Sequence, residues 1–289
     1  MKRKPDFIII GAMKCATTSI HVQLTRQPGI FVHGPGELEF FSDDEVYARG
    51  MDWYESLFDR AGIGDLCGER STEYTKLPTY PNTVSRMHHD LPDARLIYVM
   101  RHPLDRLVSH YMHEWLARRV STPIETAATE HPELVGYGCY DLQLEPYLQA
   151  FGRARILPVF FERLVAEPQQ ELERICRFIG YSAVPRWDHG LGAQNVSLER
   201  VRRGPLWQRV LDVPALQTLR RRLIPERARS RVRKLWQIAE RPEIARSQRE
   251  DLCRVFDGDL ARLGAKLGVD LSCENFKAVV ASRPLEWTA

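Results

Sequence analysis

The chain has 289 residues, of which 44% are hydrophobic and 27% charged, and its formal net charge is +3. This is the composition of an ordinary globular protein of one large or two small domains, and the net charge is too small to indicate a nucleic-acid partner. The six cysteines form no C-x-x-C pair and no zinc-binding spacing, so we expect reduced thiols.

The N-terminal segment begins with basic residues and continues into an apolar run of only four residues, 7–10. Such a run is too short for a secretion signal or a membrane span. We therefore expect a cytoplasmic protein.

Short apolar runs alternate with longer helical patterns along most of the chain. This alternation predicts an α/β fold in which a central parallel sheet of about five strands is flanked by helices. Pro158 lies within the last apolar run and indicates a defect or an edge strand there. The expected strands are residues 6–10, 29–32, 64–69, 94–100 and 154–161, and the expected helices are residues 17–27, 78–90, 103–119, 141–152 and 162–180.

The last third of the chain is expected to be helical and is rich in arginine. Residues 200–234 contain eleven arginines and one lysine against two acids, Asp212 and Glu226, and a helical pattern returns near residues 244–268. A solvated helix face would explain these arginines. An anion-facing surface, toward ligand phosphates, a charged acceptor or a membrane headgroup layer, would explain them as well.

The loop after the first expected strand, in FIIIGAMKCATTS (residues 7–19), has the features of an anion site. Backbone N–H groups at a helix N-terminus attract anions together with the helix dipole. Three neighbouring hydroxyl residues, Thr17, Thr18 and Ser19, add donors in the first turn, and Lys14 adds a positive charge. Helix capping is the alternative, but it explains one hydroxyl better than three and leaves the lysine unexplained. The lysine also comes earlier than in the nucleotide loop G-x-x-x-x-G-K-[ST].

A second cluster follows the strongest expected strand, in YVMRHPLDRLVSHYMHEW (residues 98–115). Arg101 comes at the end of the strand, where open α/β sheets bind ligands, and Pro103 favours a helix start directly afterwards. Ser109 lies about two helical turns further on, so the two side chains can address one phosphate if the chain turns back between them. A salt bridge at the strand end is the alternative for Arg101.

Together, five ordered segments resemble the sulfotransferases that use 3′-phosphoadenosine 5′-phosphosulfate (PAPS), and most closely the heparan-sulfate-type and related bacterial enzymes. The resemblance implies a fold like that of P-loop nucleotide hydrolases. The resemblance covers roughly residues 5–205 and, more loosely, the C-terminal helix. The helical pattern of the last third indicates a continuation of the same domain, so we expect a single domain over residues 1–289, with a nucleotide-binding core (5–200) and a helical extension (200–289). The five segments are GAMKCATTS (11–19), GPGELEFFSDD (34–44), GERSTEYT (68–75), VMRHPLDRLVSHYMHE (99–114) and PVFFERLVAEPQQELERICRFIG (158–180).

The resemblance implies a role for each matching residue. Lys14 would stabilise the phosphate that leaves the sulfuryl group, and the three hydroxyl residues would hold the 5′-phosphate. Arg101 and Ser109 would hold the 3′-phosphate, which distinguishes PAPS from ATP. PAPS has no triphosphate, and no metal ion is implied. The implied nucleotide-binding residues are Gly11, Ala12, Lys14, Cys15, Ala16, Thr17, Thr18, Ser19, Arg101 and Ser109, with Arg202, Arg203 and Gly204 from the basic loop VRRGP (201–205).

A base must take the proton of the acceptor hydroxyl as it attacks sulfur in line. Glu37 matches the glutamate of the family motif, and a surface-loop acid is the alternative interpretation. His113 is a rival or an assistant, because it follows Ser109 by four residues on one helix face and histidine titrates near neutral pH. A helix-surface histidine without a catalytic role is the alternative there.

Three positions depart from the family pattern. Ala16 stands where glycine is common, Gly36 where a lysine commonly precedes the glutamate, and Glu39 where histidine is common. Two of these positions concern the acceptor, so the acceptor side is the part that the resemblance predicts least well.

The sequence lacks the motifs of two other classes of nucleotide-binding enzyme. A P-loop kinase would need the G-K-[ST] ending and a metal-binding acid after a strand, and neither is in place. A dinucleotide oxidoreductase would need G-x-G-x-x-G, which is absent from the sequence. A non-catalytic protein that binds anionic polymers or membranes through residues 200–234 is a further alternative. For the enzyme we expect a hydroxyl-bearing small molecule, lipid or carbohydrate as acceptor, with LVGYGCY (134–140) as one possible lining; the oligomeric state stays open. Cys15 lies inside the loop, and two interpretations of it stay open. Its oxidation would block PAPS binding, or it is only a small buried side chain.

Overall fold

The computed structural model describes residues 3–34, 36–191 and 242–288. The predicted site residues Arg202, Arg203 and Gly204 lie outside the described residues, and so does the arginine-rich segment 200–234.

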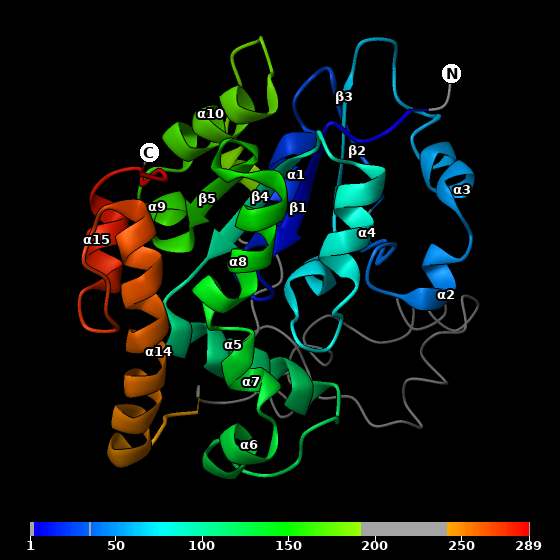
Figure 1. Cartoon of the computed structure of the whole chain (residues 1–289). Helices are drawn as coiled ribbons and strands as arrows, with labels where there is room; N and C mark the ends of the chain where they lie inside the picture. The colour runs from blue at the N-terminus through cyan, green and yellow to red at the C-terminus, as the bar shows by residue number, and fades with distance from the viewer. Residues whose placement is uncertain (1–2, 35, 192–241, 289) are drawn as a thin grey trace, which may run out of the picture.

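A parallel sheet of five strands forms the centre of the molecule, in the order β2-β3-β1-β4-β5 (Figure 1). The apolar runs of β1 and β4 are buried on both faces of the sheet, which explains why they are continuous rather than alternating. The predicted strands are confirmed, and β5, which contains Pro158, is an edge strand. The strands are β1 (Phe7–Gly11), β2 (Ile30–Val32), β3 (Leu66–Arg70), β4 (Arg95–Met100) and β5 (Ile156–Phe160).

Helices surround the sheet, and the sequence predicted the longer ones. The helix expected over residues 162–180 is two helices, because the chain leaves helical geometry at Glu167, the residue before Pro168. The described α-helices are α1 (Thr17–Thr25), α2 (Asp44–Tyr47), α3 (Met51–Ser56), α4 (Thr83–Asp90), α5 (Pro103–Leu116), α6 (Ile124–Glu130), α7 (Glu133–Gly136), α8 (Tyr140–Phe151), α9 (Phe161–Ala166), α10 (Pro168–Ile179), α14 (Arg246–Leu267) and α15 (Phe276–Ser282). Short 3-10 helices are η1 (Thr72–Thr75), η2 (Arg153–Arg155) and η3 (His189–Leu191).

The helices form a layer on each face of the sheet. The connections β1 to β2 and β3 to β4 run in opposite directions across the sheet, so right-handed crossovers place α1 and α4 on opposite faces. Helix α1 packs against α10, and α4 packs against α8. At the C-terminus, α14 packs against α8 and α15 against α9, as the orange and red ribbons in Figure 1 show.

One hydrophobic core joins the strands to the C-terminal helices. Phe7 of β1, Leu260 of α14 and Phe276 of α15 are all buried members of the same cluster. The single domain over residues 1–289 stays a prediction. No helix in the described ranges has the length and apolar character needed to cross a membrane.

Candidate active site

Two parts of the predicted site, the loop after β1 and Arg101, lie at the carboxyl ends of neighbouring strands. β1 pairs with β3 on one side and with β4 on the other. The loop 11–16 follows β1, Ser71 follows β3 and Arg101 follows β4. Ligands of open parallel sheets bind outside the carboxyl ends of the strands, where connections leave in opposite directions, so the fold places these residues at the expected edge.

The loop after β1 is tied to the sheet by its first residues. The N–H of Ala12 donates to Val99 O (2.8 Å), and the N–H of Cys15 donates to Ala12 O (3.3 Å). Gly11 has no room for a side chain, because a Cβ atom there would lie 2.0 Å from Thr75 Oγ1. The loop therefore has a fixed start from which Lys14 and the head of α1 extend.

Lys14 and Ala16 both have left-handed backbone conformations, each with φ 69°. Residues other than glycine disfavour this region, because Cβ approaches the neighbouring carbonyl oxygen. Glycine would therefore suit this backbone conformation better than the alanine that stands at position 16. The loop keeps the left-handed turn in spite of the alanine.

The three hydroxyl residues occupy the first turn of α1 without capping it. The cap residue is Ala16, which makes no side-chain capping hydrogen bond. Thr17 is buried, and Thr18 and Ser19 are half-buried. Simple N-capping therefore does not explain these three residues, and their place at the N-terminus of α1 fits a binding site for an anion.

Cys15 is fully buried, and its thiol lies 3.8 Å from the Tyr140 hydroxyl. Burial raises the pKa of this thiol to about 12, so it is protonated near neutral pH and is a poor nucleophile. The geometry supports the small buried side chain over a thiol that is open to oxidation. Participation of Cys15 in nucleotide binding stays a prediction.

Arg101 lies against the loop that follows β1. Its Nη1 donates to Lys14 O at 3.5 Å, and its guanidinium carbon lies 4.5 Å from the centre of the Phe161 ring. The Tyr140 hydroxyl fixes the backbone here by accepting from Arg101 N (3.2 Å) and donating to Arg101 O (2.6 Å). Two strand ends thus place a lysine and an arginine side by side.

Ser109 and His113 both lie on α5, four residues apart and so on one face of the helix. Ser109 is buried, and His113 is half-buried. Their convergence with Arg101 and Glu37 on a ligand stays a prediction.

Glu37, the expected base, is held by side chains and backbone at the exit of β3. Arg70 Nη1 donates to Glu37 Oε1 at 2.5 Å. The N–H and Oγ1–H of Thr72 donate to Glu37 Oε2 at 2.7 and 2.8 Å. A carboxylate has about four acceptor positions, so these three donors leave about one for a further hydroxyl. Neighbouring donors therefore fix the orientation of the Glu37 carboxylate, and its role as the base stays a prediction.

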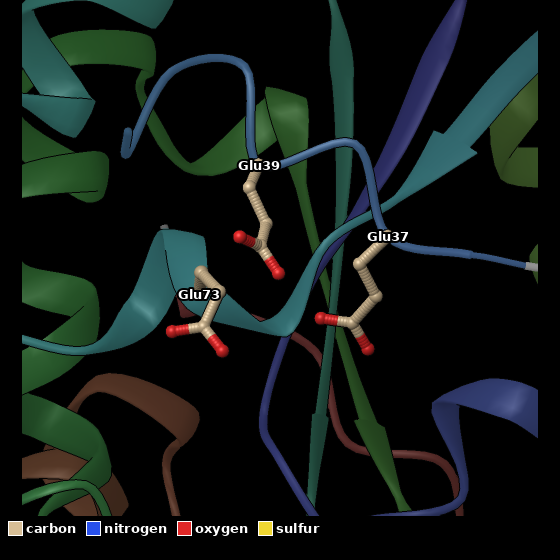
Figure 2. A group of neighbouring side chains, drawn as sticks. All are labelled: Glu37, Glu39 and Glu73. Atoms are coloured by element: carbon tan, nitrogen blue, oxygen red, sulfur yellow. The ribbon is translucent and has the colours of Figure 1, made fainter. Parts of the chain in front are cut away.

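Two further carboxylates lie beside Glu37. Figure 2 shows Glu37 and Glu39 on the loop that follows β2 and Glu73 on η1, and oxygens of the three groups lie within 4.8 Å of one another. Burial, followed by the charges of Glu73 and Glu37, raises the pKa of Glu39. Arg70 pairs with Glu37, and Lys76 pairs with Glu73 at 2.5 Å. Two of the three negative charges are thus compensated by cations of the chain itself, and we assign no metal to the group.

Beneath this group, the carboxyl of Glu69 in β3 is fully buried. Its Oε1 accepts from the hydroxyls of Tyr54 (2.6 Å) and Tyr74 (3.0 Å). Burial raises the pKa of Glu69 to about 7, although interactions with the two tyrosines and with Ser71 lower it. Glu69 is therefore a carboxyl whose charge changes with pH close to neutrality.

The free energy of unfolding should decrease as the pH rises from about 4.5 to about 7, because the pKa of Glu69 is raised in the folded protein. Over this range the unfolded chain has released the proton that the folded protein still holds, so the free energy of unfolding decreases as the pH rises. Glu69→Gln should remove this component, which is on the order of 3 kcal/mol. Urea denaturation of both proteins at each end of the range measures it, and an identical pH dependence would contradict the assignment.

Several residues of this region were not assigned roles from the sequence. Arg70 and Thr72 stand in GERSTEYT, a segment that the sequence identified only as a strand and its exit. A cavity of about 260 Å³ also lies beside the loop, between the head of α1, the start of α9 and residues 187–191. Its lining includes Ala16, Ser19, Phe161, Leu164, Trp187 and His189. No pattern in the sequence marks Trp187 as part of the site.

The fold defines an α/β protein of the P-loop-like class, with Lys14, Arg101 and the N-terminus of α1 at the carboxyl end of its sheet. Residues 5–185 match the model of the Sulfotransferase family, and the chain belongs to that family. A family of transferases agrees with the expected enzyme and favours it over the kinase and the non-catalytic binder.

Individual relatives agree with this assignment. The chain is 31% identical over 193 residues to heparan sulfate glucosamine 3-O-sulfotransferase 3B1 of Mus musculus, a match that covers 63% of this chain and 48% of the relative. It is 35% identical over 126 residues to the membrane-associated sulfotransferase kil1 of Dictyostelium discoideum, covering 42% and 26% of the two chains. The matched part thus spans about half or less of the length of these relatives.

A solved structure is similar over nearly the whole chain. The sulfotransferase from Alicyclobacillus acidocaldarius is 26% identical, with a TM-score of 0.65 over 93% of this chain and 98% of that one. The predicted fold class is therefore confirmed.

Proposed function

We propose that this protein transfers the sulfuryl group of PAPS to a hydroxyl of a small-molecule, lipid or carbohydrate acceptor. One observation carries the proposal: Arg101 reaches across to the backbone of Lys14, at the head of the helix that bears Thr17, Thr18 and Ser19. An arginine and a helix N-terminus side by side suit a nucleotide with two separate anionic groups. We propose Arg101, with Ser109, for the 3′-phosphate and the loop for the 5′-phosphosulfate.

The proposed reaction is an in-line displacement at sulfur. The acceptor oxygen forms a bond to sulfur while the bond from sulfur to the 5′-phosphate oxygen breaks. Glu37 takes the proton of the acceptor hydroxyl at its remaining acceptor position. Lys14 stabilises the negative charge that grows on the leaving phosphate oxygen, and the products are a sulfate ester and adenosine 3′,5′-bisphosphate. The step uses no metal ion.

The cavity beside the loop is the proposed place of the adenine base. It touches Ala16 and Ser19, which follow the phosphate loop, and it offers the aromatic rings of Phe161 and Trp187. Flat apolar groups of a ligand bind well between such rings, with few polar groups to fix their orientation. The ring of Phe161 also lies under Arg101, which joins the two parts of the proposed nucleotide site.

Three carboxylates lie on the acceptor side; Arg70 and Lys76 pair with Glu37 and Glu73, and Glu39 is the carboxylate that these two cations do not pair with. Gly36 and Glu39 replace the lysine and histidine that are common in the family pattern, and Glu37, Glu39 and Glu73 face one region (Figure 2). Some relatives are named for heparan sulfate, a polyanion, which a group of carboxylates would repel. We therefore propose an acceptor with little negative charge near the reacting hydroxyl.

The proposed function is tested by incubating the protein with PAPS and a panel of neutral and charged hydroxyl compounds. Mass spectrometry should detect an acceptor that gains one sulfate, together with adenosine 3′,5′-bisphosphate. A chelator in the buffer should leave the yield unchanged, because no metal takes part. Absence of transfer to any compound, together with absence of binding of adenosine 3′,5′-bisphosphate, would reject the proposed function.

Arg101→Ala should weaken the binding of PAPS and of adenosine 3′,5′-bisphosphate by about 10- to 100-fold. The reason is the loss of a charged hydrogen-bond donor to the 3′-phosphate, which is bound equally before and during the reaction. Turnover at saturating PAPS should therefore change little, whereas KM for PAPS should rise. Arg254→Ala, on the exposed face of α14, is the matched control. Unchanged affinity in the Arg101 variant would contradict this role.

A further inference from the structure

The exit of β3, residues 70–72, contacts the Glu37 loop at each of its three residues. Arg70 and Thr72 donate to the Glu37 carboxylate itself. Ser71 lies between them and makes a different contact. Its Oγ accepts the backbone N–H groups of Leu38 and Glu39, both at 2.9 Å. Ser71 thus holds the backbone directly after the expected base.

The environment of Ser71 makes this contact hard to replace. The residue is 0% exposed, so no water reaches its hydroxyl. Its two acceptor positions are both used by the N–H groups. Glu39 has a left-handed backbone with φ 56°, a conformation that a side chain disfavours and that the surroundings must maintain.

We propose that Ser71 is a positioning residue, which fixes the backbone after Glu37 and thereby aims the Glu37 carboxylate at the acceptor hydroxyl. This rests on the proposed function, in which Glu37 is the base. Without Ser71 Oγ, two N–H groups lose their acceptor in a buried place, so the loop must move to satisfy them. Arg70 and Thr72 would then hold a carboxylate whose backbone is displaced.

The first test compares Ser71→Ala with Ser71→Thr, which keeps the hydroxyl. Ser71→Ala should lower kcat by about 10- to 100-fold, because small displacements of a catalytic group have effects of this size. The affinity for adenosine 3′,5′-bisphosphate should stay unchanged, and Ser71→Thr should restore most of the activity. Thr83→Val removes an equally buried hydroxyl from α4 and should have no effect on kcat. Normal kcat in Ser71→Ala would overturn the proposal.

The second test asks whether Ser71 acts through Glu37. In Glu37→Asp, the carboxylate is already displaced by one methylene group but is still present. If Ser71 only places that carboxylate, adding Ser71→Ala should lower kcat by less than about twofold in this background. A second full loss of 10-fold or more would show that Ser71 acts independently of Glu37 and would overturn the proposal.

The third test needs no acceptor and therefore separates this proposal from the proposed function. Amide hydrogen exchange should become at least 10-fold faster in a peptide covering residues 37–41 of Ser71→Ala, but not in one covering α1. Unchanged exchange in residues 37–41 would overturn the positioning role even if transfer is found. If Ser71→Ala does not fold, Ser71→Cys, with a weak sulfur acceptor, takes its place in all three tests.

Discussion

Lys14→Ala should lower turnover with PAPS by about a hundredfold or more while the affinity for the nucleotide is largely kept. In the proposed mechanism the ammonium group meets the charge that develops on the leaving phosphate, and such interactions act mainly in the transition state. Alanine is the suitable replacement because Lys14 has a φ of 69°, and glycine would relax the loop as well as remove the charge. Single-turnover kinetics with excess enzyme measure the chemical step directly.

The control for this variant is Lys4→Ala. Lys4 is exposed, and its Nζ donates to Asp90 O, away from the loop. This variant should turn over at the normal rate. A slower rate would show that the loss of any positive charge lowers turnover. Near-normal turnover in Lys14→Ala would reject the leaving-group role and leave Lys14 as a binding residue.

Glu37→Gln should reduce transfer by about two to four orders of magnitude and leave the binding of adenosine 3′,5′-bisphosphate intact. The amide cannot take the acceptor proton, although it has nearly the shape of the carboxylate. It also places an NH₂ group against either Arg70 or Thr72, so the unfolding free energy is measured in parallel. The rate of transfer at saturating nucleotide is the deciding measurement.

Glu45→Gln, on α2, serves as the matched control, because it removes a carboxylate from an exposed position. His113→Ala is compared in the same assay, since His113 is the alternative base. If Glu37→Gln keeps its activity and His113→Ala loses it, His113 is the base and Glu37 is not.

Much of the fold and part of the site followed from local patterns. Uninterrupted apolar runs such as residues 7–10 predicted buried parallel strands, and the five strands are confirmed. Arg101 was expected at a strand end, and it lies against Lys14 because β1 and β4 are neighbours in the sheet. A polar residue that directly follows a buried strand carries strong information, since the carboxyl ends of parallel strands share one edge.

The remaining parts of the site depend on contacts that no local pattern encodes. Arg70 and Thr72 hold Glu37 from 33 and 35 residues away. That contact depends on β3 lying between β2 and β1, and the sheet order cannot be read from the spacing of apolar residues. Likewise, the role of Ala16 as the cap residue of α1 appears only in the backbone angles.

The most direct test of the central claim is calorimetry of the intact protein with adenosine 3′,5′-bisphosphate. The claim is that the loop after β1 and Arg101 together bind a nucleotide with separate 3′- and 5′-anionic groups. It predicts saturable binding at one site, at least about tenfold weaker binding of adenosine 5′-monophosphate, which lacks the 3′-phosphate, and a smaller difference between the two ligands in Arg101→Ala. No detectable binding of adenosine 3′,5′-bisphosphate, or equal affinity for the two nucleotides, would contradict it.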